Sequence, residues 1–258
     1  MRPPRRRRTT RKYVPPYELN ELPVEALTAI AKDLIARRVL REASGGDISG
    51  AEWERMFASA IGGEWHNSVN GLDDVRLNDC AWAVKSVKKD RPDRQRRLRL
   101  ICGRNSIHYS YGITDPTKLD PSDIGARVLE IWNDRVAEAL SSYRELRTVV
   151  FIRSDDLERI VLFEMPTMTY DAEQFEWKWN NRKNLVGLKD GKNCFTWQPH
   201  GAQFTIHVEV PEVRHLVRIS IPSDVVSIRR DDLLDLIDFR EHWIEYRRLG
   251  PEDQDGTI

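Results

Sequence analysis

Three acidic side chains and one lysine occur in an order that could hold a divalent metal beside a phosphodiester. Glu54 lies in the segment SGAEWERMF, Asp73 and Asp74 follow in a loop, and Lys85 lies in CAWAVKSVK. Metal-dependent hydrolysis of a phosphodiester requires carboxylates that converge on the ion, and a cation near the attacking water or the scissile phosphate. These residue types predict such a site, provided that the fold brings the three segments together.

The elements that must position these side chains are a helix, a loop and a strand. Ser49 and Glu52 have the spacing of a capping box, so Glu54 is left over on the first turns of the predicted helix. In CAWAVKSVK alternate residues point to opposite faces of a strand, which places Ala83 and Lys85 on one face. A carboxylate at position 83 would share the face of Lys85, but alanine stands there.

A helix with Gly-x-x-Trp-Glu, then an Asp, then about ten residues leading to a strand with x-x-Lys, resembles the PD-(D/E)XK nuclease superfamily. This superfamily includes most type II restriction endonucleases, and the resemblance covers residues 49 to 88. It implies Mg²⁺ as cofactor and double-stranded DNA as substrate. It also implies Asp74, with Asp73 as second choice, as the first metal ligand, Lys85 as the lysine that positions or activates water, and Glu54 as an assisting acid.

Two positions depart from the superfamily pattern. Asp74 is preceded by an aspartate and not by proline, and Ala83 occupies the place of the second metal-binding acid. A glutamate there would give CAWEVKSVK, close to the usual strand. Three interpretations stay open: an inactivating substitution, a ligand supplied from elsewhere, such as Glu130 on the following helix, or a site without activity.

Other acid-x-Lys patterns compete with this assignment. They are Glu176-x-Lys178, with Asp171 or the Asp155–Asp156 turn upstream, and Asp190-x-Lys192 in a predicted hairpin turn. Such a three-letter pattern arises by chance in most chains of this size. The first site is preferred because its helix, loop acid and strand occur together and in order.

Basic residues are concentrated in two runs, although the formal net charge is zero. Residues 1–12 hold seven Lys/Arg and no acid, and residues 85–99 hold eight Lys/Arg. Each run alone could be a solvated segment, but two of them favour contact with a nucleic-acid backbone. We expect DNA contacts from these runs and from three polar loops: Lys88, Lys89, Arg94, Arg96, Arg97, Arg104, Asn105, Arg182, Lys183, Gln198, His200 and Gln203.

The order of predicted elements, with helices, a few strands, a helix and then strands, indicates an α/β (α+β) fold. We expect a mixed central β-sheet flanked by helices, restriction-endonuclease-like as the resemblance implies, and a β-rich C-terminal half. A flexible basic arm is predicted over residues 1–18 and a single nuclease domain over 19–250. Within that domain we expect the core at about 49–166, a β-rich DNA-recognition part at about 167–222 and a C-terminal helix at about 230–248.

Several other functions lack the residues that they require. No segment approaches the roughly 20 apolar residues of a membrane helix, and the three cysteines show neither metal nor disulfide spacing. We therefore expect a reducing, bacterial cytoplasm. The histidines are scattered, and neither a phosphate-binding Gly-rich loop nor a Ser or Cys nucleophile motif occurs.

Together these observations predict a Mg²⁺-dependent, sequence-specific double-stranded DNA endonuclease of the type II restriction class. Cutting both strands usually requires two active sites, which predicts a homodimer with two-fold symmetry. The alternatives are a repair or structure-specific nuclease of the same fold, a non-catalytic DNA-binding protein that has lost the acid, and a protein-interaction domain.

Overall fold

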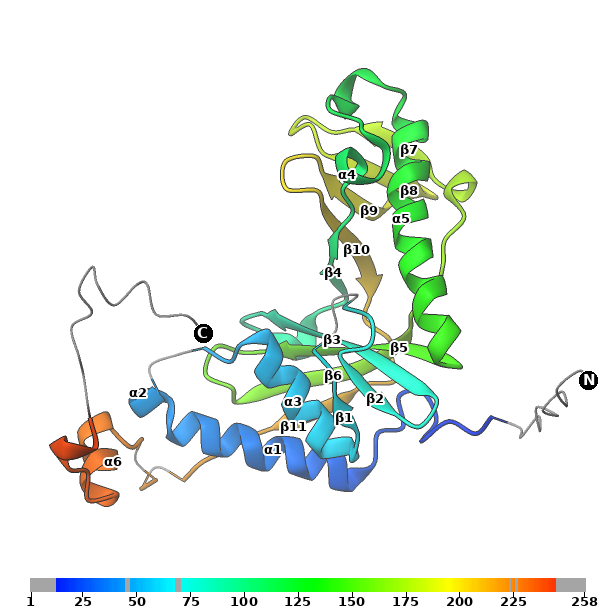
Figure 1. Cartoon of the computed structure of the whole chain (residues 1–258). Coiled ribbons are helices and arrows are strands. Elements are labelled where there is room, and N and C mark those ends of the chain that lie inside the picture. Colours follow the sequence, from blue (N-terminus) through cyan, green and yellow to red (C-terminus); the bar gives the residue numbers. More distant parts are fainter. Residues whose placement is uncertain (1–12, 45–46, 68–70, 223, 226, 245–258) are drawn as a thin grey trace, which may run out of the picture. The chain divides into compact units, whose positions relative to one another are not determined.

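The chain forms two compact units (Figure 1). The computed structural model describes residues 13–44, 47–67, 71–222, 224–225 and 227–244. The first unit comprises the described residues up to Ile35 and those from Ile48 to Ser220, and the second comprises those of Ala36–Asp47 and those from Ile221 onward. Two units therefore occur where one domain was predicted over residues 19–250.

A six-stranded central sheet forms the base of the first unit, with the strand order β1-β2-β3-β5-β6-β11. Its strands are β1 (Glu64–Trp65), β2 (Val75–Leu77), β3 (Cys80–Lys88), β5 (Glu145–Arg153), β6 (Arg159–Pro166) and β11 (His215–Arg218). β3 and β5 are parallel and the other neighbours are antiparallel, so the sheet is mixed as predicted. The parallel pair needs a crossover connection, and this connection includes α5 (Pro121–Ser142).

Helix α3 (Gly50–Ile61) packs on one face of the central sheet. Ser49 and Glu52 form the capping box that the sequence predicts. The ring of Trp53 lies 4.9 Å from that of Phe151 on β5, measured between centroids. This packing fixes α3, and with it Glu54, against the sheet.

A second sheet has the order β4-β10-β9-β8-β7. Its strands are β4 (Arg97–Arg104), β7 (Glu176–Trp179), β8 (Leu185–Lys189), β9 (Lys192–Gln198) and β10 (Gln203–Glu209). Helix α5 lies along one face of this sheet (Figure 1). β4 lies within the predicted core but pairs with β10 of the second sheet. β11 lies within the predicted recognition part but pairs with β6 of the central sheet. The predicted division near residue 166 is therefore not a spatial boundary.

One hydrophobic core joins these layers. It contains Ala81, Ala83, Val150 and other residues of the central sheet, the inner face of α5, and the inner face of the second sheet. Residues of α5 such as Val128 and Trp132 therefore contribute to both sheets. The Lys85 face of β3 is the face that continues into this core.

Helix α1 (Val24–Val39) is followed by the short helix α2 (Arg41–Ser44). A short helix, α4 (Ile107–Tyr111), stands where the sequence predicted a polar loop. The hydroxyl of Ser106 accepts a hydrogen bond from the backbone N–H of Tyr109, and Gly112 ends the helix at a φ of 70°. A serine cap and a left-handed glycine are the usual ends of a helix. The remaining single turns are η1 (Pro92–Arg94), η2 (Pro116–Lys118), η3 (Ala172–Gln174) and η4 (Glu241–Trp243).

Both ends of the described chain differ from the prediction. The arm predicted over residues 1–18 is structured from Tyr13 onward, because Tyr13 and Tyr17 bind side chains of the central sheet; residues 1–12 lie outside the described residues. In the second unit, α6 (Arg230–Leu236) is shorter than the helix predicted over 230–248. Asp238 adopts a left-handed φ of 52°, which stops the helix, and residues 245–248 lie outside the described residues.

Candidate active site

Asp74 lies directly before β2, and Lys85 lies on the part of β3 that extends beyond its pairing with β2. Val75 pairs with Trp82, so the preceding Asp74 lies level with the middle of β3. The Oδ2 atom of Asp74 accepts a hydrogen bond of 2.9 Å from the backbone N–H of Val84. The same oxygen lies 4.0 Å from Nζ of Lys85. The structure therefore brings together the acid and the lysine that the sequence singled out.

The carboxyl group of Asp74 is buried, and its surroundings alter its protonation. Burial raises the pKa of Asp74 above its usual value, and the nearby charges of Glu54 and Asp73 act in the same direction. The ammonium group of Lys85 and the N–H of Val84 lower the pKa and partly oppose this. Because a metal binds the deprotonated carboxylate, the raised pKa would make metal binding at Asp74 weaken as the pH falls.

Glu54 stands at the edge of this site and is held by an aromatic side chain. Its Oε2 atom accepts a hydrogen bond of 2.9 Å from Nε1 of Trp65 on β1. The guanidinium group of Arg55 lies 4.2 Å from the Trp65 ring centroid and covers the indole. Glu54 is therefore a fixed carboxylate, and its charge raises the pKa of Asp74.

Asp73 makes other contacts. Its Oδ2 atom lies 3.1 Å from Nδ1 of His66 and accepts a hydrogen bond of 3.2 Å from the hydroxyl of Tyr143. These bonds tie the loop to neighbouring elements. Asp73 therefore serves better as an anchor of the loop than as a metal ligand, in agreement with the preference for Asp74.

Ala83 leaves the site one carboxylate short. It is 1 % exposed and belongs to the hydrophobic core. Among the described residues, no group of three or more His, Cys, Asp or Glu side chains could hold a metal ion. Mg²⁺ often binds through one or two carboxylates together with water and substrate phosphates. Asp74 is the carboxylate that would hold Mg²⁺ in this way, with Glu54, whose charge acts on Asp74, as the second acid.

The alternative acids do not assemble a comparable site. Glu130 is exposed on α5 and accepts a hydrogen bond of 2.7 Å from the hydroxyl of Tyr111. Glu176 and Lys178 pair with each other at 3.4 Å on exposed positions of β7. The upstream acids of that pattern are engaged elsewhere: Asp171 caps η3, and Asp155 pairs with Lys88. Asp190 has a φ of 51° in the β8–β9 hairpin turn, as predicted for KDGK.

Arg135 on α5 is a second cation near Asp74, and sequence reasoning missed it. Its Nη1 atom donates a hydrogen bond of 2.9 Å to the backbone oxygen of Cys102. A Cβ atom on Gly103, which has a φ of 106°, would lie 2.9 Å from Nη1, so glycine is required for this close approach. Burial lowers the pKa of Arg135, while Cys102 and Asp74 raise it. The charge of Lys85 lowers the pKa of the Cys102 thiol, against the larger effect of burial. Lys85 and Arg135 therefore both lie near β4.

The residues expected to contact DNA are mostly on the surface. The exposed ones are Lys88, Lys89, Arg94, Arg96, Arg97, Arg104, Arg182, Lys183 and His200, and the half-buried ones are Gln198 and Gln203. Lys88 is paired with Asp155, and Arg97 donates a hydrogen bond to the backbone oxygen of Asn193.

Asn105 is a correction to this set. It is 0 % exposed, and its Nδ2 atom donates a hydrogen bond of 2.8 Å to the backbone oxygen of Val128. Its backbone oxygen accepts a hydrogen bond of 2.9 Å from Nε1 of Trp197. Asn105 thus joins α5 to the second sheet and cannot contact a base edge.

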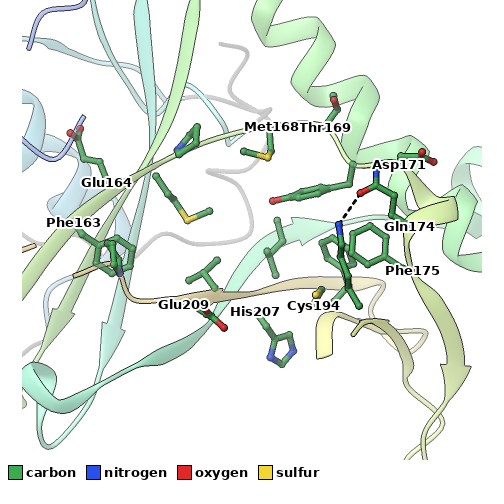
Figure 2. A pocket seen from close by; sticks show the side chains of 18 of the residues that line it. Phe163, Glu164, Met168, Thr169, Asp171, Gln174, Phe175, Cys194, His207 and Glu209 are labelled. Carbon is green, nitrogen blue, oxygen red and sulfur yellow. Dashed lines mark hydrogen bonds between the residues drawn. The ribbon is translucent and has the colours of Figure 1, made fainter. Parts of the chain in front are cut away.

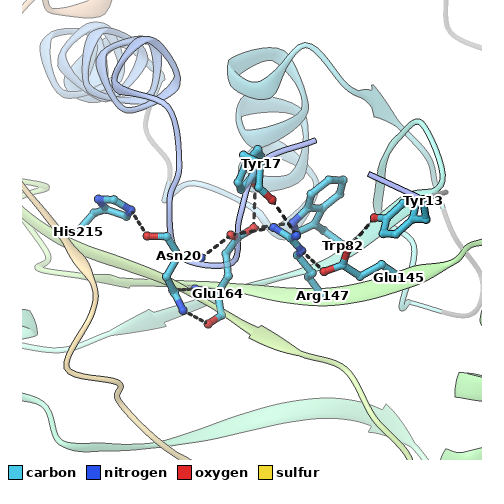
Figure 3. Close-up of polar contacts among 8 residues, drawn as sticks. All are labelled: Tyr13, Tyr17, Asn20, Trp82, Glu145, Arg147, Glu164 and His215. Carbon is cyan, nitrogen blue, oxygen red and sulfur yellow. Dashed lines mark hydrogen bonds and ion pairs between the residues drawn. The ribbon is translucent and has the colours of Figure 1, made fainter. Parts of the chain in front are cut away.

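A buried polar network (Figure 3) lies on the face of the central sheet that carries Trp82, opposite the face of Ala83 and Lys85. The carboxylate of Glu164 accepts hydrogen bonds of 2.6 Å from Nε1 of Trp82 and 2.8 Å from the hydroxyl of Tyr17. Nη1 of Arg147 lies 3.4 Å from Oε2 of Glu164, and both side chains are 1 % exposed. Burial, followed by the charge of Glu164, raises the pKa of Tyr17 far above its usual value.

The same network fixes the N-terminal segment to the sheet. Asn20 bonds both the backbone N–H and the backbone oxygen of Glu164, at 2.6 and 2.9 Å. Tyr13 donates a hydrogen bond of 2.6 Å to Glu145, which in turn accepts one of 2.7 Å from Arg147. These bonds satisfy the buried charges, so we assign the network a structural role. The only sequence signal was a glutamate inside the apolar strand RIVLFEMP.

A cavity of about 750 Å³ lies apart from the candidate active site (Figure 2). Its walls are largely apolar and include Phe163 and Met165 of β6, Phe195 of β9 and Ile206 of β10. Neither Asp74 nor Lys85 lines it. The cavity therefore takes no part in the chemistry considered below.

Comparisons of the chain with protein-family models, with curated proteins and with solved structures gave no significant match. None of the helices in the described part of the chain is long and apolar enough to cross a membrane.

Proposed function

We propose that this protein is a Mg²⁺-dependent, sequence-specific double-stranded DNA endonuclease of the type II restriction class, with an active site that is incomplete at Ala83. The observation that carries the proposal is the contact of the Asp74 carboxylate with the N–H of Val84 and its 4.0 Å separation from Lys85. The element order supports it. A helix, three antiparallel strands, a crossover helix and a parallel strand (α3, β1, β2, β3, α5, β5) follow one another, in keeping with the mixed sheet flanked by helices that the resemblance to the PD-(D/E)XK superfamily implies.

In this proposal each residue of the site has a distinct task. A bound Mg²⁺ would polarise the scissile phosphate and lower the pKa of an attacking water. Asp74, with Glu54 beside it, would hold the ion. Lys85 would orient the water, and Arg135 would add positive charge close to where negative charge develops on the phosphate.

Ala83 limits the activity expected of the chain as it stands. A glutamate at position 83 would project from the same face of β3 as Lys85 and would supply the missing carboxylate. We therefore expect weak or undetectable cleavage by this chain. Two copies related by a two-fold axis would cut the two strands of a near-palindromic site.

The test is cleavage of a plasmid in the presence of Mg²⁺ by three proteins. They are this chain, its Ala83→Glu variant and the Ala83→Glu/Lys85→Ala double variant. Discrete fragments from the single variant, lost in the double variant, would support the proposed site. Cleavage by the parent chain that the Ala83→Glu substitution does not increase would mean that the metal-binding acid lies elsewhere.

A second candidate function follows from the missing carboxylate. A protein that retains the fold and the cations, but whose described residues lack a group of three metal-binding side chains, could bind DNA without cutting it. In that case neither the parent nor the Ala83→Glu variant would cut, while both would bind duplex with an affinity that falls steeply as salt rises.

A further inference from the structure

The face of the second sheet opposite α5 carries a row of polar residues. Arg99 on β4 pairs with His207 on β10, and Nε2 of His207 lies 2.9 Å from Oγ1 of Thr196 on β9. Thr196 pairs with Val186 on β8, which pairs with Lys178 on β7. All five residues lie on one face, because directly paired residues point to the same side of a sheet, and His207 shares the face of Thr205, the partner of Thr196. Four of them are polar, and Val186 on β8 is a buried apolar residue.

The four polar residues of this row line a cavity of about 530 Å³. Its described lining consists of guanidinium, ammonium, amide, hydroxyl, imidazole and indole groups, without an acid: Arg99, Lys178, Trp179, Asn180, Asn181, Arg182, Asn184, Asn193, Thr196 and His207. We call it the amide pocket. The charge of Lys178 is partly compensated by Glu176, whose Oε1 atom lies 3.4 Å from Nζ of Lys178. Arg99 and Arg182 therefore supply most of the positive charge of the amide pocket.

The side chains of the pocket are unequally free to bind a ligand. The Asn180 carboxamide oxygen accepts hydrogen bonds from the N–H groups of Arg182 and Asn184, at 2.9 and 3.0 Å, and so shapes the β7–β8 turn. For Asn181 and Asn184 no side-chain hydrogen bond occurs within the described part of the chain. The turn therefore presents two available amides beside an arginine.

Two polar atoms of the lining also lack partners. Nε1 of Trp179 and Oδ1 of Asn193 are buried without a hydrogen bond to any described residue. Buried polar atoms are nearly always paired, so these two favour a guest that brings hydrogen-bonding groups. His207 adds no positive charge near neutral pH, since burial, with Arg99 and Arg97, lowers its pKa to about 4.

We propose that the amide pocket contacts the base edges of duplex DNA and sets the sequence preference of the protein, with Asn181 and Asn184 as base contacts and Arg99 and Arg182 as phosphate contacts. This inference rests on the proposed function. Asn pairs through two bonds with adenine in the major groove. The β7–β8 turn, which carries Asn181 and Asn184, lies at the edge of the second sheet, where β7 is the terminal strand. A lining without acids suits a polyanion.

The experiment uses the full chain with Ala83 unchanged, so that bound DNA stays uncut or nearly so. Selection from a pool of randomised duplexes identifies the preferred sequence. Competition between this duplex and a scrambled one then gives a specificity ratio. Asn181→Ala/Asn184→Ala should reduce the ratio about ten- to a hundredfold, as expected for loss of base contacts.

The phosphate contacts have a different signature. Arg99→Gln and Arg182→Gln should each weaken binding to both duplexes and reduce the slope of log affinity against log salt by about 1, with little change in the ratio. Two control variants lie outside the pocket: Lys192→Gln, which removes a pair with Glu209 on the same sheet, and Lys118→Gln on η2. They should leave the ratio unchanged, and urea unfolding of every variant establishes that it folds.

The outcomes separate this inference from the proposed function. The inference is overturned if the double Asn variant keeps the parent ratio, or if the parent selects no sequence. Failure of the proposed function is measured independently, as absence of cleavage of the selected duplex by the Ala83→Glu variant. A base-contacting pocket on a protein that does not cut would leave the binding result intact.

Discussion

Oδ2 of Asp74 lies 4.0 Å from Nζ of Lys85, yet the pKa of this carboxyl group is raised and not lowered. Burial outweighs the attraction of the ammonium group. A carboxylate in such a position costs folding free energy that a bound cation can recover. The Asp74–Lys85 pair therefore adds little to the stability of the fold, which fits the metal-binding role that we propose for Asp74.

Asp74→Asn should therefore stabilise the protein while abolishing any cleavage. The amide oxygen can still accept the bond from Val84, and the cost of a buried charge disappears, which we expect to be worth on the order of 1 kcal/mol at pH 7. In the folded state Asp74 holds its proton to a higher pH than in the unfolded state, where its pKa is near 3.8. The free energy of unfolding of the parent should thus fall as the pH rises from about 3.8 through the higher pKa of Asp74 in the folded state. Below that range the stability advantage of Asp74→Asn should vanish.

Urea unfolding at a series of pH values measures this difference. Asp73→Asn is the matched control, because its carboxylate accepts a bond from Tyr143 and contacts His66. It should be neutral or destabilising. An Asp74→Asn protein that is less stable than the parent at pH 7 would contradict the account of the site.

Arg135→Gln, made in the Ala83→Glu background, should slow DNA cleavage under single-turnover conditions by about 10²- to 10³-fold. This is the usual effect of removing one group that stabilises transition-state charge. Affinity for the duplex should change much less, because the Lys and Arg residues on the surface remain. Arg135→Lys should recover part of the rate, since it keeps the charge but cannot reach Cys102 with the same geometry. Equal losses of rate and affinity would instead indicate a purely structural role.

The buried network should be more important for stability than any surface ion pair. Glu164→Ala would leave Arg147 buried without one of its two carboxylates, which should cost about 3–5 kcal/mol of unfolding free energy. Tyr17→Phe removes a bond to a charged acceptor and should cost about 1.5–3 kcal/mol. Glu164→Gln keeps the shape and an acceptor oxygen, so it should be milder than the alanine variant. Chemical denaturation gives all three values, and a Glu164→Ala protein as stable as the parent would refute the assignment.

Gly125 on α5 is the point of closest approach to the second sheet. A Cβ atom there would lie 2.2 Å from the indole of Trp177, well inside van der Waals contact. Gly125→Ala should therefore destabilise the protein by about 1–3 kcal/mol, as overpacking does. Trp177→Leu in the same chain should relieve the clash. Gly50→Ala at the start of α3 is the control, because its Cβ would meet nothing closer than 3.9 Å.

Short-range signals were sufficient to predict part of the local structure, although they did not predict α4 or the end of α6. The Ser49–Glu52 spacing predicted the start of α3, and the alternation in CAWAVKSVK placed Ala83 and Lys85 on one face of β3. The choice of Asp74 came from the resemblance of residues 49–88 to the superfamily, and the structure places Asp74 directly before β2, which pairs with β3.

Long-range packing could not be predicted in this way. Arg135 reaches Cys102 across 33 positions of sequence, and Tyr17 reaches Glu164 across 147. Nothing in the local pattern of either partner identifies the other. Asn105 was misassigned for the same reason, since its partner Val128 lies on α5. A polar residue in a loop has the same sequence signature whether it faces solvent or a helix.

Helix α5 carries both Gly125 and Arg135, ten positions apart on one continuous helix of 22 residues. The first residue is clamped against the second sheet, and the second stands beside Asp74. At 1.5 Å per residue these points are about 15 Å apart along a rod that bends little. A displacement of the second sheet would therefore be transmitted along α5 to the guanidinium group of Arg135. Under the proposed function, binding of a ligand at the second sheet would thus alter how Arg135 is aligned with Asp74.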